Sequence, residues 1–556
     1  MIAGGRRVAL VAGGGAGIGA ATAIGLARDG CDVVVLDPGV SVEGRPSGKT
    51  QPSATVDQIN GNGGRACLKR VSVTDNAGVA SAIGELLDEF GRLDVVVNAA
   101  GFDRRADYLE GTAQDWADVL DVHVNGHLNL LAHAVPALAN SGGGRFLGFT
   151  SGAGWRAGHG NAYGCAKRVI CVLAWSLASC LPRGLTFNVI SPIADTRMTH
   201  AHARDPAAGL NPANFPPAEH IAPLAVHLTN RERTGYNGEV LFTDGSDVTR
   251  VGAPRLLEAA GFDGSADSFG VLVPGILAPA EADQRSAGGA AARRLRTNGS
   301  RGSVPLSDES CAVVVTPGSS WLAGNDLVSL LAARGLRAVI IDGALDDVPT
   351  ESVFATAEDR LRTADGKAPA RCALILTEPV GTEVSPLGAP WRHVVRPFSA
   401  LTTRVLHQAA WMRALAHRSR LAGGVRVVSL QGEAGAADVA ASQAIAQLGR
   451  GMARRETGLI HPFSLAVRGD RRAWQTALEF ASHLVTDPAA IPLAGAELVV
   501  GDAWVGVNAH PQPASTVTFD GPLVPEWLDQ ALLDPLTAKF ARSDRLHGIS
   551  VGPDSR

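Results

Sequence analysis

Short runs of β-branched residues alternate with longer stretches rich in alanine and leucine along the first 250 residues. The run VALVA precedes GIGAATAIGLARDG and DVVVLD, and later runs include LDVVVNAAG, GRFLGFTS and LTFNVISP. Strands separated by helices in this way are typical of βαβ units, whose strands form a parallel sheet. We therefore expect an α/β fold with a doubly wound parallel sheet over residues 1–255.

The hydrophobic pattern of the first segment returns after about 300 residues. LARDGCDVVVLD (26–37) matches LAARGLRAVIID (331–342) without a gap, and the stretch at 225–245 resembles that at 481–502. Between about 262 and 308 the chain has few large apolar residues, which is typical of a linker. The sequence thus predicts two tandem Rossmann-like domains, at 1–255 and 309–556, joined by a linker at 256–308, with the second copy degenerate.

Composition narrows the classes of function. The 556 residues exceed what one hydrophobic core usually serves, and a net charge of -4 gives no basic excess for nucleic acid or an anionic membrane. The chain has no 18-residue apolar stretch and no signal-peptide core, and its seven cysteines show no metal-binding spacing. We expect a cytoplasmic protein with a small-molecule ligand, no metal, and neither nucleic acid nor membrane as a partner.

A glycine-rich turn follows the first predicted strand. Gly13, Gly17 and Gly19 stand between that strand and a helix, where glycines allow a tight turn and let the backbone approach a pyrophosphate. Asp37 ends the second strand, and a carboxylate there would accept hydrogen bonds from the adenosine ribose and repel a 2′-phosphate. The sequence predicts a dinucleotide site that prefers NAD to NADP.

The chain resembles the short-chain dehydrogenase/reductase family in the order and approximate spacing of its motifs from residue 6 to about 250. The motifs are the glycine turn with Ile18, NAAG at 98–101, a serine in FTSGAG, the pair in NAYGCAK, and NVISPIADTRM at 188–198. The resemblance implies Ser151, Tyr163, Lys167 and His123 as catalytic residues, and Gly13, Gly17, Ile18, Gly19, Asp37, Asn98, Ala99, Gly101, Lys167 and Thr196 as cofactor-binding residues.

In this family a tyrosine carries the proton that balances hydride transfer. Tyr163 and Lys167 are one helical turn apart, so the lysine charge is expected to lower the tyrosine pKa by roughly three units, or about 4 kcal/mol. By resemblance, Ser151 polarises the substrate oxygen and Thr196 contacts the carboxamide of the cofactor. His123 stands where the family usually has asparagine.

A closer resemblance suggests a substrate. The long segment after the second strand, together with AAGFDRRADYLEGTAQDWADVLDVHVNG, looks like the dehydrogenase units of type 2 multifunctional β-oxidation enzymes, which also carry this histidine and act on 3-hydroxyacyl-CoA with NAD. We expect an NAD-dependent oxidoreductase for a secondary alcohol or ketone, such as a 3-hydroxyacyl or 3-oxoacyl thioester. A ketoreductase for a polyketide, steroid or other bulky metabolite is one alternative, and a dinucleotide-sensing or scaffold protein is another.

The second copy lacks the catalytic pair. Alignment places Asp438 at the position of Tyr163 and Ser442 at that of Lys167, while Leu322 replaces the middle glycine of the turn. We predict that this copy is inactive and binds no dinucleotide. Its apolar helices, at about 405–421 and 439–455, are expected to pack on the catalytic helices as an intramolecular pseudo-dimer. Two such chains could then associate further as a homodimer.

Overall fold

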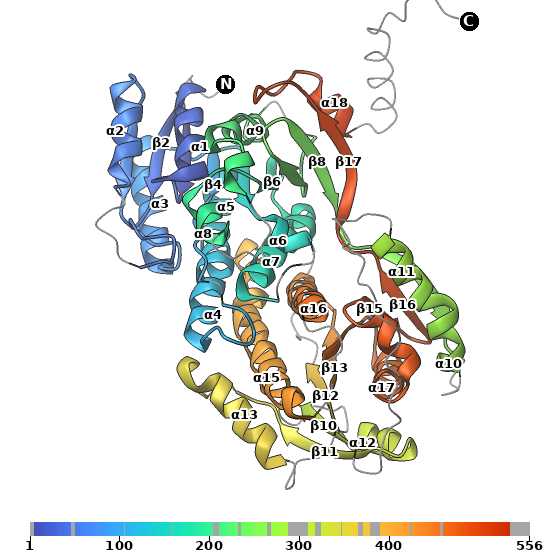
Figure 1. Ribbon diagram of the computed structural model, residues 1–556. Coiled ribbons are helices and arrows are strands. Elements are labelled where there is room, and N and C mark those ends of the chain that lie inside the picture. Colours follow the sequence, from blue (N-terminus) through green and yellow to red (C-terminus); the bar gives the residue numbers. More distant parts are fainter. Residues whose placement is uncertain are drawn as a thin grey trace, which may run out of the picture.

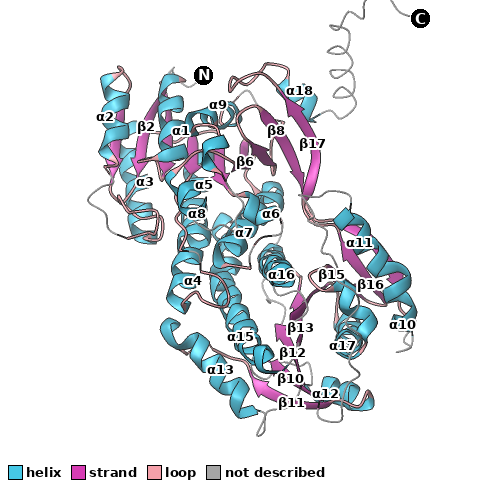
Figure 2. Cartoon of the chain, in the orientation of Figure 1, coloured by secondary structure: helices cyan, strands magenta, loops and turns pink. Residues whose placement is uncertain are grey.

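The computed structural model describes residues 5–45, 51–104, 106–156, 158, 160–203, 211–231, 235–263, 268–286, 310–316, 324–345, 347–364, 371–378, 390–422, 425–455 and 460–533. The described residues form two large sheets with helices packed on both, as Figures 1 and 2 show. The chain is therefore an α/β protein with two Rossmann-like domains, which confirms the expected fold class.

The first sheet has nine strands. In spatial order they are β17 (Gln512–Thr518), β8 (Asp247–Gly252), β7 (Val240–Thr243), β6 (Leu185–Pro192), β5 (Gly144–Phe149), β4 (Val95–Asn98), β1 (Arg7–Ala12), β2 (Cys31–Leu36) and β3 (Ala66–Lys69). The strands from β7 to β3 are parallel, whereas β8 and β17 run antiparallel to their neighbours.

Helices cover both faces of this sheet, which is why its central strands are continuous apolar runs. Val8 and Leu10 of β1 join the core beneath α3, α4, α5 and α7, whereas Ala9 and Val11 join the core beneath α1, α2 and α9. The helical elements here are α1 (Gly17–Arg28), α2 (Ser53–Gly61), α3 (Asn76–Phe90), α4 (Ala113–Leu120), η1 (Asp121–Asn125), α5 (Gly126–Asn140), α6 (Gly152–Trp155), α7 (Ala162–Leu177), η2 (Ala178–Cys180), α8 (Arg197–Ala203), η4 (Pro212–Asn214), η5 (Ala218–His220), α9 (Ala222–Leu228) and α18 (Leu528–Leu533).

The second sheet repeats the strand order of the first. Its strands are β11 (Arg337–Asp342), β10 (Ser310–Thr316), β12 (Arg371–Glu378), β13 (Val425–Gly432), β14 (Ile460–Val467), β15 (Glu497–Gly501), β16 (Trp504–Asn508) and β9 (Leu256–Gly261). Its helical elements are α10 (Ser268–Leu272), η6 (Val273–Leu277), α11 (Ala278–Ser286), α12 (Gly324–Ala333), η7 (Thr350–Ser352), α13 (Val353–Ala364), α14 (Trp391–Val395), η8 (Arg396–Ala400), α15 (Leu401–Ala422), α16 (Ala436–Arg455), α17 (Arg471–Thr486) and η9 (Pro488–Leu493). The order from β11 to β16 corresponds to that from β2 to β8.

The two sheets exchange their last strands. Residues 247–261 pair antiparallel with residues 504–518, so that β17 completes the first sheet and β9 completes the second. Figure 1 shows this pair running from one sheet to the other. The linker predicted at 256–308 therefore contains β9, α10, η6 and α11, and Phe269 enters the second core with 0% exposure. The apolar run FGVLVPGIL at 269–277 lies between two polar stretches, and those stretches gave the range the composition of a linker.

Helices of the two halves pack directly on one another. In Figure 1, α16 lies against α7, and α15 lies beside α4. Arg168 of α7 and Gln443 of α16 meet across this contact, with 3.0 Å between Nε and Oε1. The alignment of Tyr163 with Asp438 also aligns these two residues, so equivalent positions face each other as at a two-fold axis. One hydrophobic core extends through both halves at this interface.

Candidate active site

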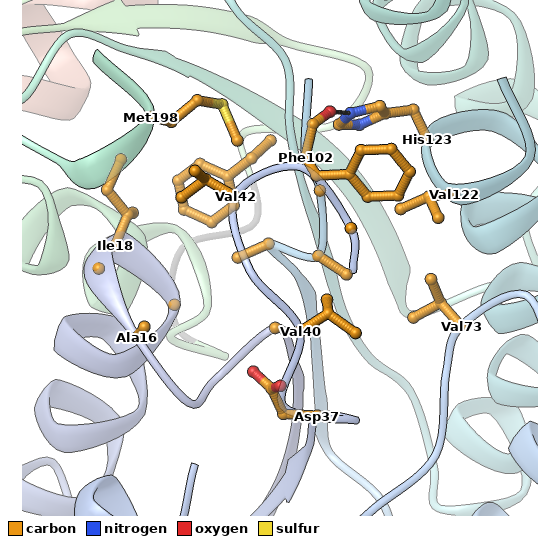
Figure 3. A pocket seen from close by; sticks show the side chains of 18 of the residues that line it. Ala16, Ile18, Asp37, Val40, Val42, Val73, Phe102, Val122, His123 and Met198 are labelled. Atoms are coloured by element: carbon orange, nitrogen blue, oxygen red, sulfur yellow. Dashed lines mark hydrogen bonds between the residues drawn. The ribbon is translucent and has the colours of Figure 1, made fainter. Parts of the chain in front are cut away.

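A cavity of about 500 Å³ opens at the carboxyl ends of the strands of the first sheet, which is where open α/β sheets bind their ligands. Every candidate residue except Asn98 lines it. Figure 3 shows Asp37 at one end of this cavity and Met198 and His123 at the other. The sequence motifs therefore converge on one site, although they lie far apart along the chain.

The glycine turn between β1 and α1 has the conformation that its residues predict. Gly13 and Gly17 have φ of +72° and +54°, which favours glycine at both positions. A Cβ atom on Gly19 would lie 2.1 Å from the carbonyl oxygen of Gly13, whereas one on Gly17 would meet nothing within 4 Å. Because α1 begins without a side-chain cap, its first N–H groups can face an anion in the cavity.

Asp37 is fixed at the end of β2 by the backbone. Its Oδ2 accepts a hydrogen bond of 2.9 Å from the N–H of Gly15, and Oδ1 accepts one of 2.8 Å from the N–H of Gly39. Each carboxylate oxygen has a further lone pair for a hydroxyl donor. Its position in the cavity wall beside the glycine turn is the one that suits an adenosine ribose.

Asn98 supports the cavity from below, since it is fully buried at the end of β4. Its Oδ1 accepts a hydrogen bond of 3.2 Å from the N–H of Ala100, which holds the chain at Ala99 and Gly101 against the cavity. The structure thus separates Asn98 from the residues that can touch a ligand directly, whereas Ala99, Gly101 and Thr196 are in the wall.

Ser151, Tyr163 and Lys167 meet at the other end of the cavity. Ser151 begins α6, and Tyr163 is on the first turn of α7, where Oδ1 of Asn161 accepts a hydrogen bond of 2.8 Å from the N–H of Gly164. The side chains of Tyr163 and Ser151 are hydrogen-bonded. Nζ of Lys167 lies 5.3 Å from the centre of the Tyr163 ring and donates a hydrogen bond of 2.9 Å to the carbonyl of Phe149.

Burial sets the protonation of this pair. Burial and the negative charge of Asp103 raise the pKa of Tyr163, although the hydrogen bond with Ser151 opposes the rise. Burial lowers the pKa of Lys167 from 10.5 to about 7. The expected fall of the tyrosine pKa is thus not found in this structure, because both groups are desolvated and the ammonium faces Phe149 rather than the tyrosine hydroxyl.

His123 lies on η1, a single π-helical turn between α4 and α5, and its side chain has 0% exposure. Its ring meets that of Tyr163 edge-on at 5.2 Å, and Nε2 lies 2.8 Å from the carbonyl oxygen of Phe102. Burial and then the charge of Lys167 hold the pKa of His123 well below its usual range, so the ring is neutral. The carbonyl therefore requires an N–H at Nε2, which makes Nδ1 an acceptor, and that atom is buried with no partner.

Gly101 makes room for this histidine. A Cβ atom on Gly101 would lie 2.3 Å from Cε1 of His123, so the last glycine of the NAAG motif allows the ring to approach. His127, one turn further along, directs Nδ1 at the carbonyl oxygen of His123 at 2.7 Å, and burial lowers its pKa to about 3. Two neutral imidazoles are thus buried one turn apart, and the ring of His123 is the one that contacts Tyr163.

Sequence reasoning did not identify the wall formed by the segment after β2. The N–H of Asp103 bonds the carbonyl of Val42 at 3.2 Å, and Nε of Arg104 bonds that of Glu43 at 2.9 Å. Val42 and Phe102 line the cavity together with Met198, whose sulfur lies 3.7 Å from the hydroxyl of Tyr163 (Figure 3). The unusual length of this segment indicated that it could have a role. Its contact with residues 102–104 could not be predicted, because it joins parts of the chain that are about 60 residues apart.

Comparison with known proteins agrees with this geometry. Residues 7–207 match the short chain dehydrogenase family. The hydroxyacyl-CoA dehydrogenase ChsB1 of Mycobacterium tuberculosis is 33% identical over 276 residues, which cover 47% of this chain and 84% of that protein. The chain is a member of the short-chain dehydrogenase/reductase family.

Two further relatives within the short-chain dehydrogenase/reductase family are informative. The peroxisomal hydratase-dehydrogenase-epimerase of Saccharomyces cerevisiae is 33% identical over 231 residues, or 40% of this chain and 24% of that protein. The 3-oxoacyl-[acyl-carrier-protein] reductase of Synechocystis is 31% identical over 249 residues, or 42% of this chain and 98% of that protein. The resemblance to multifunctional β-oxidation enzymes is thereby confirmed.

The short-chain dehydrogenase/reductase site fits the nicotinamide dinucleotide that its family uses. Open space above Gly17, the uncapped start of α1 and the fixed carboxylate of Asp37 all face the same cavity. In the described part of the chain, no group of three or more histidine, cysteine or acidic side chains is placed to hold a metal ion. Nor does any helix within the described residues have the length and apolar character needed to cross a bilayer.

Proposed function

We propose that this oxidoreductase interconverts a secondary alcohol and a ketone with NAD(H), and that its substrate is a 3-hydroxyacyl or 3-oxoacyl thioester. The observation that carries the proposal is the meeting of Ser151, Tyr163 and Lys167 in the cavity that also holds the glycine turn. A dinucleotide sensor would need the turn but not the proton donor, so this arrangement favours catalysis over sensing.

The residues of the chain supply the proton that balances hydride transfer. When bound, the nicotinamide supplies the hydride to the substrate carbon or takes it up. Ser151 donates a hydrogen bond to the substrate oxygen, and Tyr163 gives that oxygen its proton as the ketone is reduced. Because its pKa is raised, Tyr163 stays protonated at neutral pH and suits the role of acid. Lys167 stabilises the tyrosinate that remains.

His123 contributes a positioning role in this proposal. Its ring packs edge-on against Tyr163 and is fixed by Phe102, so it restricts where the phenol can lie. His123 stands at the position where the family usually has asparagine. Its unpartnered Nδ1 is a buried hydrogen-bond acceptor beside Gly101. A proton relay through this position would therefore end on a neutral imidazole.

Asp37 supports NAD rather than NADP as the cofactor. Its carboxylate is held by Gly15 and Gly39 at the place where the ribose 2′ position would lie, so a 2′-phosphate would meet a fixed negative charge. The names of the relatives support the thioester, because they describe a hydroxyacyl-CoA dehydrogenase and a 3-oxoacyl reductase. A ketoreductase for a bulkier metabolite is the second candidate.

The second half serves, in this proposal, as a non-catalytic partner within the same chain. Asp438, at the position of Tyr163, forms an ion pair of 2.9 Å with Arg404, and Ser442 is buried in α16. Neither side chain offers the pair that proton transfer needs. Leu322 lies outside the described residues. The packing of α16 on α7 supports the pseudo-dimer. Its two members are centred on 1–255 and 309–556, but each sheet takes its last strand from beyond these limits, β17 in the first and β9 in the second.

The test is NADH oxidation with acetoacetyl-CoA, run beside NADPH and beside Tyr163→Phe. We expect turnover with NADH that falls by about 10²–10⁴ in the variant, because the phenylalanine ring keeps the packing but loses the proton. NADH binding, followed by fluorescence, should be unchanged and serves as the control. An active Tyr163→Phe enzyme would refute the mechanism, and a wild type that binds NADH but reduces no thioester would move the substrate to bulkier ketones.

A further inference from the structure

The turn that carries Ser151 is short and has little internal support. Helix α6 spans only Gly152–Trp155, and Oγ of Ser151 accepts a hydrogen bond of 3.3 Å from the N–H of Ala153. Two backbone bonds within the turn join the N–H of Gly154 to the carbonyl of Ser151 at 2.9 Å and the N–H of Arg156 to that of Gly152 at 2.8 Å. A helix of one turn is marginal by itself, so the position of Ser151 depends on contacts from outside the turn.

A glutamine from the second half supplies such contacts. Nε2 of Gln447, on α16, donates one hydrogen bond of 2.7 Å to the carbonyl of Ala153 and another of 2.6 Å to that of Arg156. Gln447 is 2% exposed, so water does not compete for these bonds. Both N–H groups of its amide are thus used on the turn that begins with Ser151.

The same helix also supports the chain where it leaves this turn and approaches Tyr163. A Cβ atom on Gly160, whose φ is +65°, would lie 3.2 Å from the backbone nitrogen of Met452 and 3.4 Å from the carbonyl oxygen of Leu448. The backbone of α16 therefore passes directly over Gly160. Helix α16 contacts the segment between Ser151 and Tyr163 near both of its ends.

We infer that Gln447 is a positioning residue for Ser151, so that the catalytically inactive half completes the active site of the other half. Gln447 holds the exit of the turn while the N-cap bond holds its start, and together they fix the direction of the serine hydroxyl. The inference rests on the proposed function, because it assigns Ser151 to the substrate oxygen. It gives the second half a specific task beyond general stabilisation.

A double-mutant cycle tests this role. Gln447→Met keeps the length and volume of the side chain but donates no hydrogen bond. We expect kcat for NADH oxidation with acetoacetyl-CoA to fall about tenfold in the wild-type background and less than about twofold in a Ser151→Ala background, since the effect passes through the serine. NADH affinity should not change, because Gln447 lies outside the cavity wall.

A matched control is available in the same half. Gln408 is 3% exposed on α15 and accepts a hydrogen bond of 3.1 Å from Ser429 within that half. Gln408→Met makes the same chemical change and should leave kcat within about twofold of the wild type. An equal loss in Gln408→Met, an additive loss in the Ser151→Ala background, or a joint fall of kcat and NADH affinity would overturn the assignment.

Hydrogen exchange gives a readout that needs no substrate. The peptide that contains residues 151–156 should exchange at least tenfold faster in Gln447→Met, whereas the peptide that contains the glycine turn at 13–19 should exchange as in wild type. Unchanged exchange at 151–156 would refute the inference even if no thioester were reduced. The wild-type arm of the kinetic assay reports separately on the proposed function.

Discussion

Replacing Arg168 with methionine should destabilise the protein strongly, and the loss should shrink in mild acid. Arg168 has 0% exposure on α7, and its Nη2 lies 2.7 Å from Oε1 of Glu497, which is 2% exposed at the start of β15. Arg450 and His510 face the same carboxylate at 3.7 and 3.3 Å. The ion pair joins the helix that carries Tyr163 to the second sheet.

The pKa of Glu497 gives the magnitude. Burial alone would raise this pKa, but the charge of Arg168, with the hydrogen bond and charge of His510 and the charge of Arg450, lowers it from 4.5 to about 2. At ~1.4 kcal/mol for each pKa unit, the difference corresponds to ~3.5 kcal/mol from the three partners together, which lies within the ~3–5 kcal/mol expected when one partner of a buried pair is removed. We expect Arg168→Met to lower the free energy of unfolding by about 3 kcal/mol at pH 7.

The pH dependence follows from the sign of the pKa change. In the wild type, the carboxylate of Glu497 contributes stability that is complete above pH 4.5 and is lost as the pH falls toward 2. Without Arg168, burial favours the protonated acid and the pKa rises, so Glu497 takes up a proton in mild acid and the penalty decreases. The deficit of Arg168→Met should therefore be largest at pH 7 and smaller at pH 5.

Urea unfolding followed by circular dichroism at pH 7 and pH 5 measures this deficit. Arg413→Met is the control, because Arg413 also crosses the interface, where it bonds the backbone carbonyl of Gly111, and its ion pair of 3.8 Å with Glu358 is long and partly exposed. It should cost about 1 kcal/mol with little change between the two pH values. A deficit below 1 kcal/mol for Arg168→Met, or one that is equal at both pH values, would refute the reasoning.

Three further predictions concern the cofactor, the lysine and the division of the chain. Asp37→Ser should raise the NADPH to NADH ratio of kcat/KM at least tenfold by removing a fixed negative charge; an unchanged ratio would exclude Asp37 as the determinant. Because the pKa of Lys167 is about 7, its charge is present below that pH and lost above it, so kcat should fall above pH 7. In Lys167→Arg the fall should vanish, and a wild-type plateau to pH 10 would contradict this. Residues 1–255 alone should aggregate on expression, since they lack β17 and the cover of α16; a stable, monomeric and fully active fragment would disprove the pseudo-dimer.

The parts of the fold that could be predicted are those whose signal is local. The central strands are buried on both faces and therefore appear as apolar runs. The glycines of the turn predict its backbone conformation, because glycine readily adopts a positive φ. The strand exchange could not be predicted, because β9 is mostly exposed and its partner lies about 250 residues away. The residues of such a strand do not indicate which sheet edge it will pair with.

The candidate site divides in the same way. The order of the motifs predicted the candidate catalytic residues, and the structure brings them to one cavity. The charges of Tyr163 and Lys167 depend on burial by loops and helices from several segments, so the pattern alone gave the wrong direction for the tyrosine pKa. The place of Gln447 beside Ser151 depends on the packing of two distant helices, which sequence spacing does not encode.

The strand exchange also determines when the first sheet can be completed during translation. Strand β8 leaves the ribosome about 260 residues before β17, its neighbour in the finished sheet. At ~10 residues per second, the first sheet would wait roughly half a minute with an open edge, a state that is prone to association with other chains. The first sheet thus reaches its final form only after β17 has been made, so a ribosome that stops before residue 512 releases a chain whose first sheet still has an open edge.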